Sequence, residues 1–163
     1  MIVFGTDLDG VKSLLPFNCK QTTLTLNSEI FFYSLQRYWF LQRVYNSYFR
    51  KPNPEIKKFM EYLLEKGVRS VVISASNEAY RKELERWLIS IGYLGDLILK
   101  ESFEEDSVEY KKRVVPANCD FYLDDKKEMV QAINDAGNGK CRAMLYRGQT
   151  SRELLEEFFP VFV

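Results

Sequence analysis

The sequence predicts an α/β fold, a Rossmann-like parallel sheet of about five strands with helices on both faces. Two observations predict it. Short apolar runs alternate with segments of helical periodicity along the chain, which is typical of a parallel sheet covered on both sides. Polar side chains directly follow several of these runs, and in such sheets ligands bind beyond the carboxyl ends of the strands.

The elements are expected in strict alternation. The five strands are expected over short apolar runs, at Ile2–Thr6, Ser70–Ile73, Leu97–Leu99, Phe121–Leu123 and Ala143–Tyr146. The helices are expected where apolar residues recur every three or four positions, at Pro54–Glu65, Asn77–Ile91, Glu104–Val115, Lys126–Ala136 and Ser151–Phe159. Pro116 is expected to end the third helix, and Thr150 or Ser151 to cap the last one.

Length and composition limit the function classes. The 163 residues suit one domain with a real core. The formal net charge is zero, so no whole-molecule field attracts nucleic acid or an anionic membrane. The chain contains no histidine, which excludes Ser-His-Asp triads, Cys-His dyads and imidazole acid–base catalysis. Catalysis would have to use carboxylates, Lys, Ser, Tyr, Cys or a metal ion.

The cysteines and the apolar runs suggest an intracellular setting. Cys19, Cys119 and Cys141 lie far apart and form no CxxC motif, so buried free thiols are expected rather than a zinc site or a disulfide. No signal peptide is recognisable, and no run approaches the roughly 18 apolar residues of a membrane-spanning helix. We therefore expect a cytoplasmic monomer or homodimer without a membrane partner.

The segment at residues 12–50 interrupts the alternation within an otherwise single domain at 1–163. Its part Asn27–Phe49 is crowded with aromatic residues on several faces, and such a helix must be covered on more than one side. A small helical insertion near the site is expected. Arg37, Arg43 and Arg50 are of the kind that stack on bases or hold phosphates, but a solvated helix face is the preferred interpretation.

The motif Asp7–Val11 directly follows the first apolar run. Residues i and i+2 of an extended backbone point to the same side, so Asp7 and Asp9 lie together. Two carboxylates this close raise each other's pKa unless a cation separates them. The motif indicates a hard divalent ion with oxygen ligands, with Mg²⁺ as the first candidate. It also indicates chemistry on an anion that the ion can bridge. A turn with solvated aspartates is the alternative.

Three more strand ends carry polar groups. Ser74 follows the second strand, Lys100 the third, and Asp124 and Asp125 the fourth. Each has a plain structural alternative: a strand-end hydroxyl, a surface charge, and a helix N-cap. Their joint occurrence in one expected crevice favours a functional site.

Three of these motifs, in this order, resemble the haloacid dehalogenase-like phosphohydrolase superfamily over about residues 1–11 and 52–146. The first motif of the family, DxD, matches Asp7–Val11, and the second, an apolar strand ending in Ser or Thr, matches Val71–Ser74. The fourth, a strand ending in paired aspartates, matches Phe121–Asp125.

The resemblance implies a role for each matched residue. Asp7 would be the nucleophile and form an aspartyl-phosphate. Asp9 would act as general acid and then as base, and would give its backbone carbonyl to Mg²⁺. Ser74 would hydrogen-bond a phosphoryl oxygen. Asp124 would bind Mg²⁺, and Asp125 would support the ion directly or through water.

The third motif of the family, a lone lysine, is poorly placed in this sequence. Lys111 is favoured over Lys100 and Lys112 as the residue that neutralises phosphoryl oxygens and holds Asp7 in place. The resemblance also implies that residues 12–50 form a small cap over the site. A packed helix without substrate contact and an oligomer interface are the alternatives.

The implied activity is a Mg²⁺-dependent phosphatase that hydrolyses a phosphate monoester. The substrate would be a small phosphorylated molecule such as a nucleotide or metabolite. A weak similarity to the phosphatase domain of polynucleotide kinase-phosphatases, around Asp124–Ala136, adds nucleic-acid ends to the substrates to test, although the net charge gives no indication of nucleic acid. A catalytically inactive binding or regulatory module is the alternative. A receiver domain is disfavoured because Lys100, not an acceptor aspartate, follows the third strand.

Overall fold

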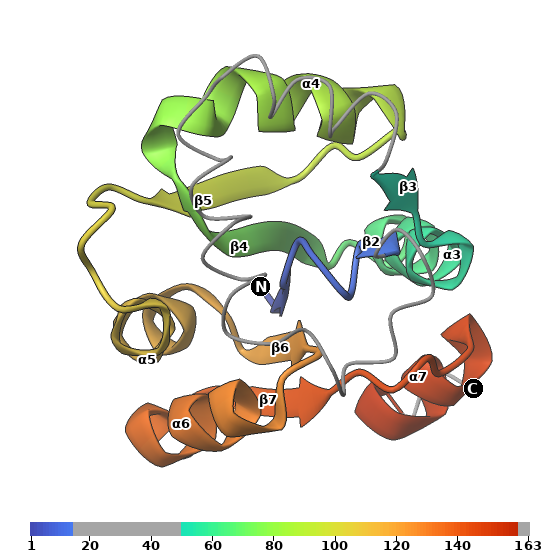
Figure 1. Ribbon diagram of the computed structural model, residues 1–163. Coiled ribbons are helices and arrows are strands. Elements are labelled where there is room, and N and C mark those ends of the chain that lie inside the picture. Colours follow the sequence, from blue (N-terminus) through green and yellow to red (C-terminus); the bar gives the residue numbers. More distant parts are fainter. Residues whose placement is uncertain (15–49, 160–163) are drawn as a thin grey trace.

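The computed structural model describes residues 1–14 and 50–159. In this part of the chain, five parallel strands form a sheet in the order β5-β4-β1-β6-β7, with β1 at its centre (Figure 1). The strands are β1 (Val3–Thr6), β4 (Arg69–Asn77), β5 (Asp96–Lys100), β6 (Phe121–Asp124) and β7 (Arg142–Leu145). The predicted parallel sheet is confirmed.

Helices cover both faces of the sheet. They are α3 (Pro54–Glu65), α4 (Arg81–Ser90), α5 (Ser107–Asn118), α6 (Lys127–Gly137) and α7 (Ser151–Phe158), and a 3-10 turn at Glu78–Tyr80 precedes α4. Apolar side chains of α3, α4 and α7 share one buried cluster with the sheet, and those of α5 and α6 share another. Figure 1 shows α5 and α6 on the opposite side of the sheet from α3 and α7.

An aromatic cluster forms the centre of the first face. Phe4 on β1 is fully buried, and its ring meets the ring of Phe59 on α3 edge to face, with centroids 5.1 Å apart. Phe158 on α7 packs on the same ring at 4.8 Å. Edge-to-face contacts add to the free energy that burial of each ring already contributes. The cluster holds α3 and α7 against the central strand.

On the second face, Gly5 allows a side chain to cross the central strand. Tyr122 on β6 is fully buried and donates its hydroxyl hydrogen to the carbonyl oxygen of Ile73 on β4 at 2.9 Å. A Cβ at Gly5 would lie 2.7 Å from the Tyr122 ring and 2.4 Å from Cys119 Sγ. The bare backbone at position 5 therefore lets one tyrosine tie the two strands on either side of β1.

The helix α5 differs from the sequence prediction. Pro116 lies inside α5, which continues to Asn118, so the expectation that Pro116 ends this helix was wrong. A proline near the end of a helix removes one backbone hydrogen bond. Burial of Val115 in the cluster shared with α6 favours continuation, and Cys119 N still donates to Val115 O at 3.0 Å.

Two other local predictions have clear outcomes. Thr150, rather than Ser151, is the N-cap of α7, and with Glu153 it forms a capping box. Cys119 and Cys141 are buried free thiols, as predicted; Cys19 lies outside the described residues.

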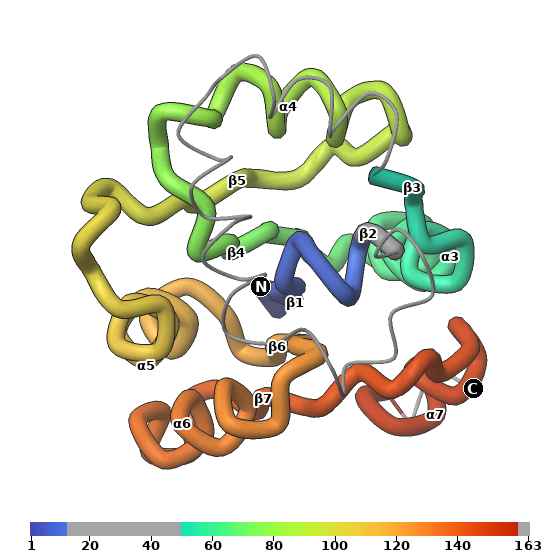
Figure 2. Tube along the Cα trace, in the orientation of Figure 1, coloured from blue at the N-terminus to red at the C-terminus, as the bar shows by residue number. Residues whose placement is uncertain are grey.

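A short antiparallel pair was not predicted. Ser13–Leu14 (β2) pairs with Lys51–Pro52 (β3), and Figure 2 shows these two strands on the path from β1 to α3. Most of the insertion expected at residues 12–50, including Asn27–Phe49, lies outside the described residues, so its role as a cap stays a prediction. Among the helices that the structure describes, none has the length and apolar character needed to cross a membrane.

We expect Phe4→Ala to lower the free energy of unfolding by about 3–5 kcal/mol, because it removes the ring that joins three elements and leaves a cavity. Chemical denaturation of the variant would measure this loss. Ile89→Ala is the control, because Ile89 is 69% exposed and its truncation should change the unfolding free energy by less than about 0.5 kcal/mol. Equal losses in both variants would contradict the assignment of the core.

Candidate active site

The acidic residues predicted from the sequence meet at the carboxyl end of the sheet. Asp7 directly follows β1, and its backbone N–H donates to Leu123 O on β6 at 2.8 Å. Asp124 ends β6 and Asp125 comes next. One carboxylate oxygen from each of these three buried aspartates lies within 4.8 Å of the others. The site therefore lies beyond the carboxyl ends of the neighbouring strands β1 and β6, which is where ligands bind in such a sheet.

Lys111 on α5 joins two of these carboxylates. Its Nζ lies 2.9 Å from Asp7 Oδ1 and 2.7 Å from Asp124 Oδ2, and its side chain is 4% exposed. The other two lysines considered from the sequence bind elsewhere. Lys100 Nζ donates to a backbone carbonyl, Glu105 O, at 2.6 Å, and Lys112 forms a surface pair on its own helix. Of the three, Lys111 is the lysine that contacts the acidic cluster.

Burial and neighbouring charges shift the protonation of this cluster. Burial raises the pKa of Asp7 to about 7, with Asp124 and Asp125 adding to the rise and Lys111 opposing it. Burial alone would lower the pKa of Lys111, but the carboxylates of Asp7 and Asp124 outweigh it and hold that pKa above its usual range. Lys111 therefore stays charged, whereas Asp7 is ionised only in part near neutral pH.

The donor set fits a hard divalent cation. When all three aspartates are ionised, their three negative charges and the one positive charge of Lys111 leave a buried net charge of minus two. An uncompensated buried charge is costly, and carboxylate oxygens are the ligands that Mg²⁺ prefers. Asp7, Asp124 and Asp125 are the residues that could hold the ion.

Gly10 brings the loop that carries Asp9 against this cluster. Its φ of +80° lies in the left-handed region, and a Cβ at this position would lie 2.0 Å from Asp125 Oδ2. Any side chain would therefore push Asp125 away from Asp7 and Asp124. The glycine of the DxDG motif is required by this close approach.

Asp9 is held by an arginine for which the sequence predicts a solvated helix face. Arg50 Nη2 donates to both carboxylate oxygens of Asp9, at 2.7 and 2.8 Å. The Arg50 side chain is 1% exposed and that of Asp9 35%, so the expected solvated face was wrong for Arg50. Trp87 on α4 holds the arginine in place: its Nε1 donates to Arg50 O at 3.1 Å, and its ring lies 5.4 Å from the guanidinium carbon.

Arg37 and Arg43, grouped with Arg50 in the sequence, lie outside the described residues. No local pattern distinguishes Arg50 from them. Its partner is 41 positions away in the chain, so only the fold reveals the pair.

Ser74 lies near the same end of the sheet, but not at the end of a strand. Thr6 pairs with Val72, so Ser74 is two residues further along β4, which continues to Asn77 across an irregular register. Ser74 is 3% exposed, donates its hydroxyl hydrogen to Ser76 Oγ and accepts from Ser76 N, both at 3.1 Å. The register of the sheet therefore places Ser74 at the same end of the sheet as the acidic cluster.

The alternative interpretation of Asp124 as a helix cap accounts for only one of its two carboxylate oxygens. Asp124 Oδ1 accepts from Lys126 N at 3.0 Å, just before α6, while Oδ2 binds Lys111. The same carboxylate thus supports the loop into α6 and belongs to the cluster.

Comparison with solved structures identifies the fold. The chain is similar to the HAD domain of the effector protein Lem4 from Legionella pneumophila, with 15% identity and a TM-score of 0.57 over 98% of this chain and 94% of that one. It is also similar to a putative beta-phosphoglucomutase from Thermotoga maritima, with 14% identity and a TM-score of 0.58 over 98% of this chain and all of that one. No protein-family model matches the chain, and neither does any curated protein sequence.

A third similar structure is larger. A chain of the Pnkp1/Rnl/Hen1 RNA repair complex shows 18% identity and a TM-score of 0.57 over 89% of this chain, which spans 42% of that one. The protein thus has the haloacid dehalogenase-like fold, as the sequence motifs predicted.

The raised pKa of Asp7 predicts a pH-dependent effect of Asp7→Asn on stability without metal. A carboxyl whose pKa rises from 3.8 to about 7 on folding contributes stability that is complete below pH 3.8 and is lost progressively as the pH rises from there to about 7. The stability of Asp7→Asn relative to the wild type should therefore increase between pH 5 and pH 8, by roughly 2–3 kcal/mol.

Thermal unfolding in EDTA at both pH values would measure this difference. Mg²⁺ added at pH 8 should raise the melting temperature of the wild type more than that of Asp7→Asn. A difference between the two proteins that is the same at pH 5 and pH 8 would contradict the assigned environment of Asp7.

Proposed function

We propose that the protein is a Mg²⁺-dependent phosphatase that hydrolyses a phosphate monoester through an aspartyl-phosphate on Asp7. The observation that carries the proposal is the contact of Lys111 Nζ with Asp7 and Asp124 beside Asp125. This arrangement offers a nucleophilic carboxylate, a fixed cation for phosphoryl oxygens and a set of ligands for a divalent ion. The similar structures include a D,D-heptose 1,7-bisphosphate phosphatase from B. bronchiseptica complexed with magnesium and phosphate, with 13% identity and a TM-score of 0.52 over 98% of this chain and 88% of that one.

In the first step, a carboxylate oxygen of Asp7 forms a bond to phosphorus while the ester P–O bond breaks. Asp9 gives its proton to the leaving oxygen, so that an alcohol departs. Lys111 balances the charge of the phosphoryl oxygens and keeps Asp7 oriented. Ser74, near the same end of the sheet, supplies a hydroxyl that can donate to a phosphoryl oxygen.

In the second step, Asp9 takes a proton from a water molecule that attacks phosphorus, and the bond to Asp7 breaks. Inorganic phosphate leaves, and both aspartates return to their starting states. Mg²⁺ bound by Asp7, Asp124 and Asp125, with the backbone carbonyl of Asp9, would shield the repulsion between carboxylates and polarise the phosphoryl group. Phosphoryl transfer depends mainly on such positioning and charge stabilisation, and no imidazole is needed.

Hydrolysis of p-nitrophenyl phosphate tests the proposal directly. The wild type should release p-nitrophenol with Mg²⁺ and not with EDTA, and Asp7→Asn should lower kcat by at least about 10³-fold because it removes the nucleophile. Asp135→Asn is the matched control: the same chemical change on an exposed part of α6 should leave kcat unchanged.

The result that would refute catalysis is equal turnover in Asp7→Asn and the wild type. A wild type that releases phosphate from no member of a panel of nucleotides, sugar phosphates and phosphorylated oligonucleotide ends would support the inactive binding module. Oligonucleotide ends belong in the panel because one similar structure is part of an RNA repair complex.

Arg50 has a positioning role in this mechanism. Its guanidinium holds both oxygens of Asp9 and is itself fixed against Trp87. A general acid is effective only when its proton lies close to the leaving oxygen. In the acid form of Asp9 one oxygen carries the proton, and the other keeps the contact with Arg50. We therefore propose that Arg50 orients Asp9 toward the leaving group.

The dependence of the rate on the leaving group separates this role from a purely structural one. Nitrophenolate leaves readily without a proton, whereas an alkoxide does not. Arg50→Met should lower kcat/KM for an alkyl phosphate such as glycerol phosphate by about 10²-fold, and for p-nitrophenyl phosphate by less than about tenfold.

The ratio of the two rates is measured within each variant, so partial unfolding lowers both rates and cancels. Arg142→Met, a change of the same kind at an exposed position, should leave the ratio at its wild-type value. Equal losses on both substrates in Arg50→Met would contradict the positioning role while leaving the phosphatase proposal intact.

A further inference from the structure

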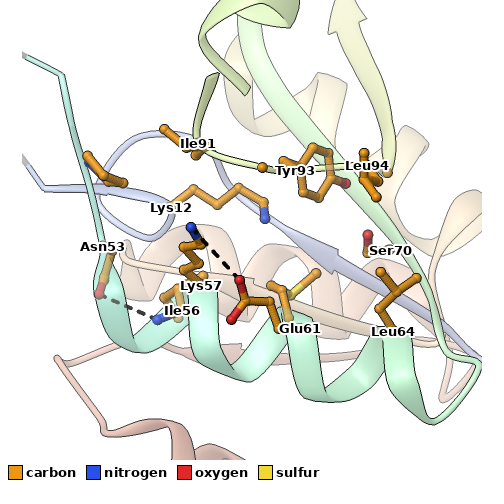
Figure 3. A pocket seen from close by; sticks show the side chains of 14 residues that line it. Lys12, Asn53, Ile56, Lys57, Glu61, Leu64, Ser70, Ile91, Tyr93 and Leu94 are labelled. Carbon is orange, nitrogen blue, oxygen red and sulfur yellow. Dashed lines mark hydrogen bonds and ion pairs between the residues drawn. The ribbon is translucent and has the colours of Figure 1, made fainter. Parts of the chain in front are cut away.

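A pocket lies apart from the acidic cluster, between α3 and the loop that joins α4 to β5 (Figure 3). Its volume is about 60 Å³. Apolar side chains from both elements dominate its wall, namely Ile56, Met60, Leu64, Ile91, Tyr93 and Leu94. Leu64 and Leu94 are 55% and 81% exposed, so the pocket is open to solvent and its rim is apolar.

The side chain of Lys12 extends into this pocket. Figure 3 shows its ammonium between Tyr93 and helix α3. Lys12 is only 5% exposed, and its Nζ lies 3.9 Å from the centre of the Tyr93 ring. The backbone fixes its position, because Asn53 N donates to Lys12 O at 2.8 Å. A lysine at the surface would keep its ammonium in water, but this one points inward.

The other charged groups of the pocket pair with each other and not with Lys12. Lys57 Nζ and Glu61 Oε1 lie 3.9 Å apart on α3, and both side chains are about half exposed. The Tyr93 hydroxyl donates to Asp96 O at 3.2 Å. Within residues 1–14 and 50–159, no carboxylate forms an ion pair with Lys12, and its ammonium contacts the Tyr93 ring.

Among the residues that the structure describes, this environment leaves a buried cation without a matching anion. Burial lowers the pKa of Lys12 to about 7, and no charge in residues 1–14 or 50–159 opposes this shift. A cation–π contact offsets only part of the cost of desolvating an ammonium. Lys12 thus contrasts with Lys111, which is equally buried but lies between two carboxylates. An anion that entered the pocket would supply what Lys12 lacks.

We propose that the Lys12 pocket binds a small carboxylic acid in its anionic form, with the carboxylate on the Lys12 ammonium and a short apolar chain against Ile56, Met60 and Leu94. The volume admits about four to six heavy atoms, at roughly 10–15 Å³ for each water-sized group. The chemistry favours a carboxylate over a phosphate, because one buried ammonium matches a single charge and the wall supplies few other donors.

This site is independent of the proposed phosphatase. None of its lining residues belongs to the acidic cluster or to the Arg50–Asp9 pair. An inactive enzyme would leave the proposal untouched, and an active one would not prove it.

Butanoate is a suitable probe, and NMR of the isotope-labelled protein is the measurement. Butanoate should shift the backbone amide signals of Ile56, Gly92 and Gly95 with a Kd on the order of 1 mM, as expected for so small a ligand. Butan-1-ol has the same chain without the charge and should bind at least tenfold more weakly. Inorganic phosphate should not shift these signals.

Lys12→Met keeps the apolar length and removes the charge. It should abolish butanoate binding, whereas Lys57→Gln, which alters a half-exposed lysine of the same pocket, should change the Kd less than threefold. Lys12→Met should remain folded and melt at a higher temperature than the wild type at pH 6, with a smaller difference at pH 10. The reason is that a lysine whose pKa falls from 10.5 to about 7 destabilises the fold most below pH 7.

The pH dependence of binding gives an additional readout. Above pH 7 the carboxylate must draw a proton onto Lys12, so the Kd should rise between pH 6.5 and pH 8.5 in the wild type. Undetectable butanoate binding in the wild type, or equal binding by Lys12→Met, would overturn the proposal. Equal binding of butan-1-ol and butanoate would show an apolar pocket that does not use the ammonium, and would overturn it as well.

Discussion

The contact of the Lys111 ammonium with Asp7 and Asp124 is the interaction on which the site depends. It brings a helix residue against carboxylates from the ends of β1 and β6, in a place where none of the three is more than 8% exposed. Removing charges from water costs several kcal/mol for each ion, and Asp125 adds a further negative charge. Such an arrangement contributes little to the stability of the fold. A chemical role therefore explains its presence better than a structural role does.

The scaffold around this contact is rigid for identifiable reasons. Tyr122 reaches across Gly5 to bind Ile73, which fixes β6 relative to β4 beneath the loop that carries Asp7. On the opposite face, Phe4 anchors the central strand β1 to α3 and α7. Close packing on both faces restricts β1, and therefore Asp7, to one position. Groups that act on a phosphoryl centre need this precision, because small displacements lower the rate strongly.

The sequence was sufficient to predict those parts of the site where the local pattern and the tertiary structure agree. Strand ends with polar residues identified the three aspartates of the cluster, because the carboxyl ends of parallel strands share one edge. The lysine was ambiguous, since Lys100, Lys111 and Lys112 all lie near that edge in sequence terms, and only the orientation of α5 separates them. The ion pair of Arg50 with Asp9 could not be predicted either, because nothing near Arg50 in the sequence indicates a partner 41 positions away.

The two buried lysines show how strongly surroundings decide the chemistry of one side chain. Both are about 95% buried, and burial alone lowers the pKa of each. Lys111 is compensated by two carboxylates and stays a fixed cation, suited to hold phosphoryl oxygens. Lys12 has an aromatic ring and an apolar wall instead, so its charge depends on what else enters the pocket. The first environment is complete in itself, whereas the second would be completed by the anion that we propose for its pocket.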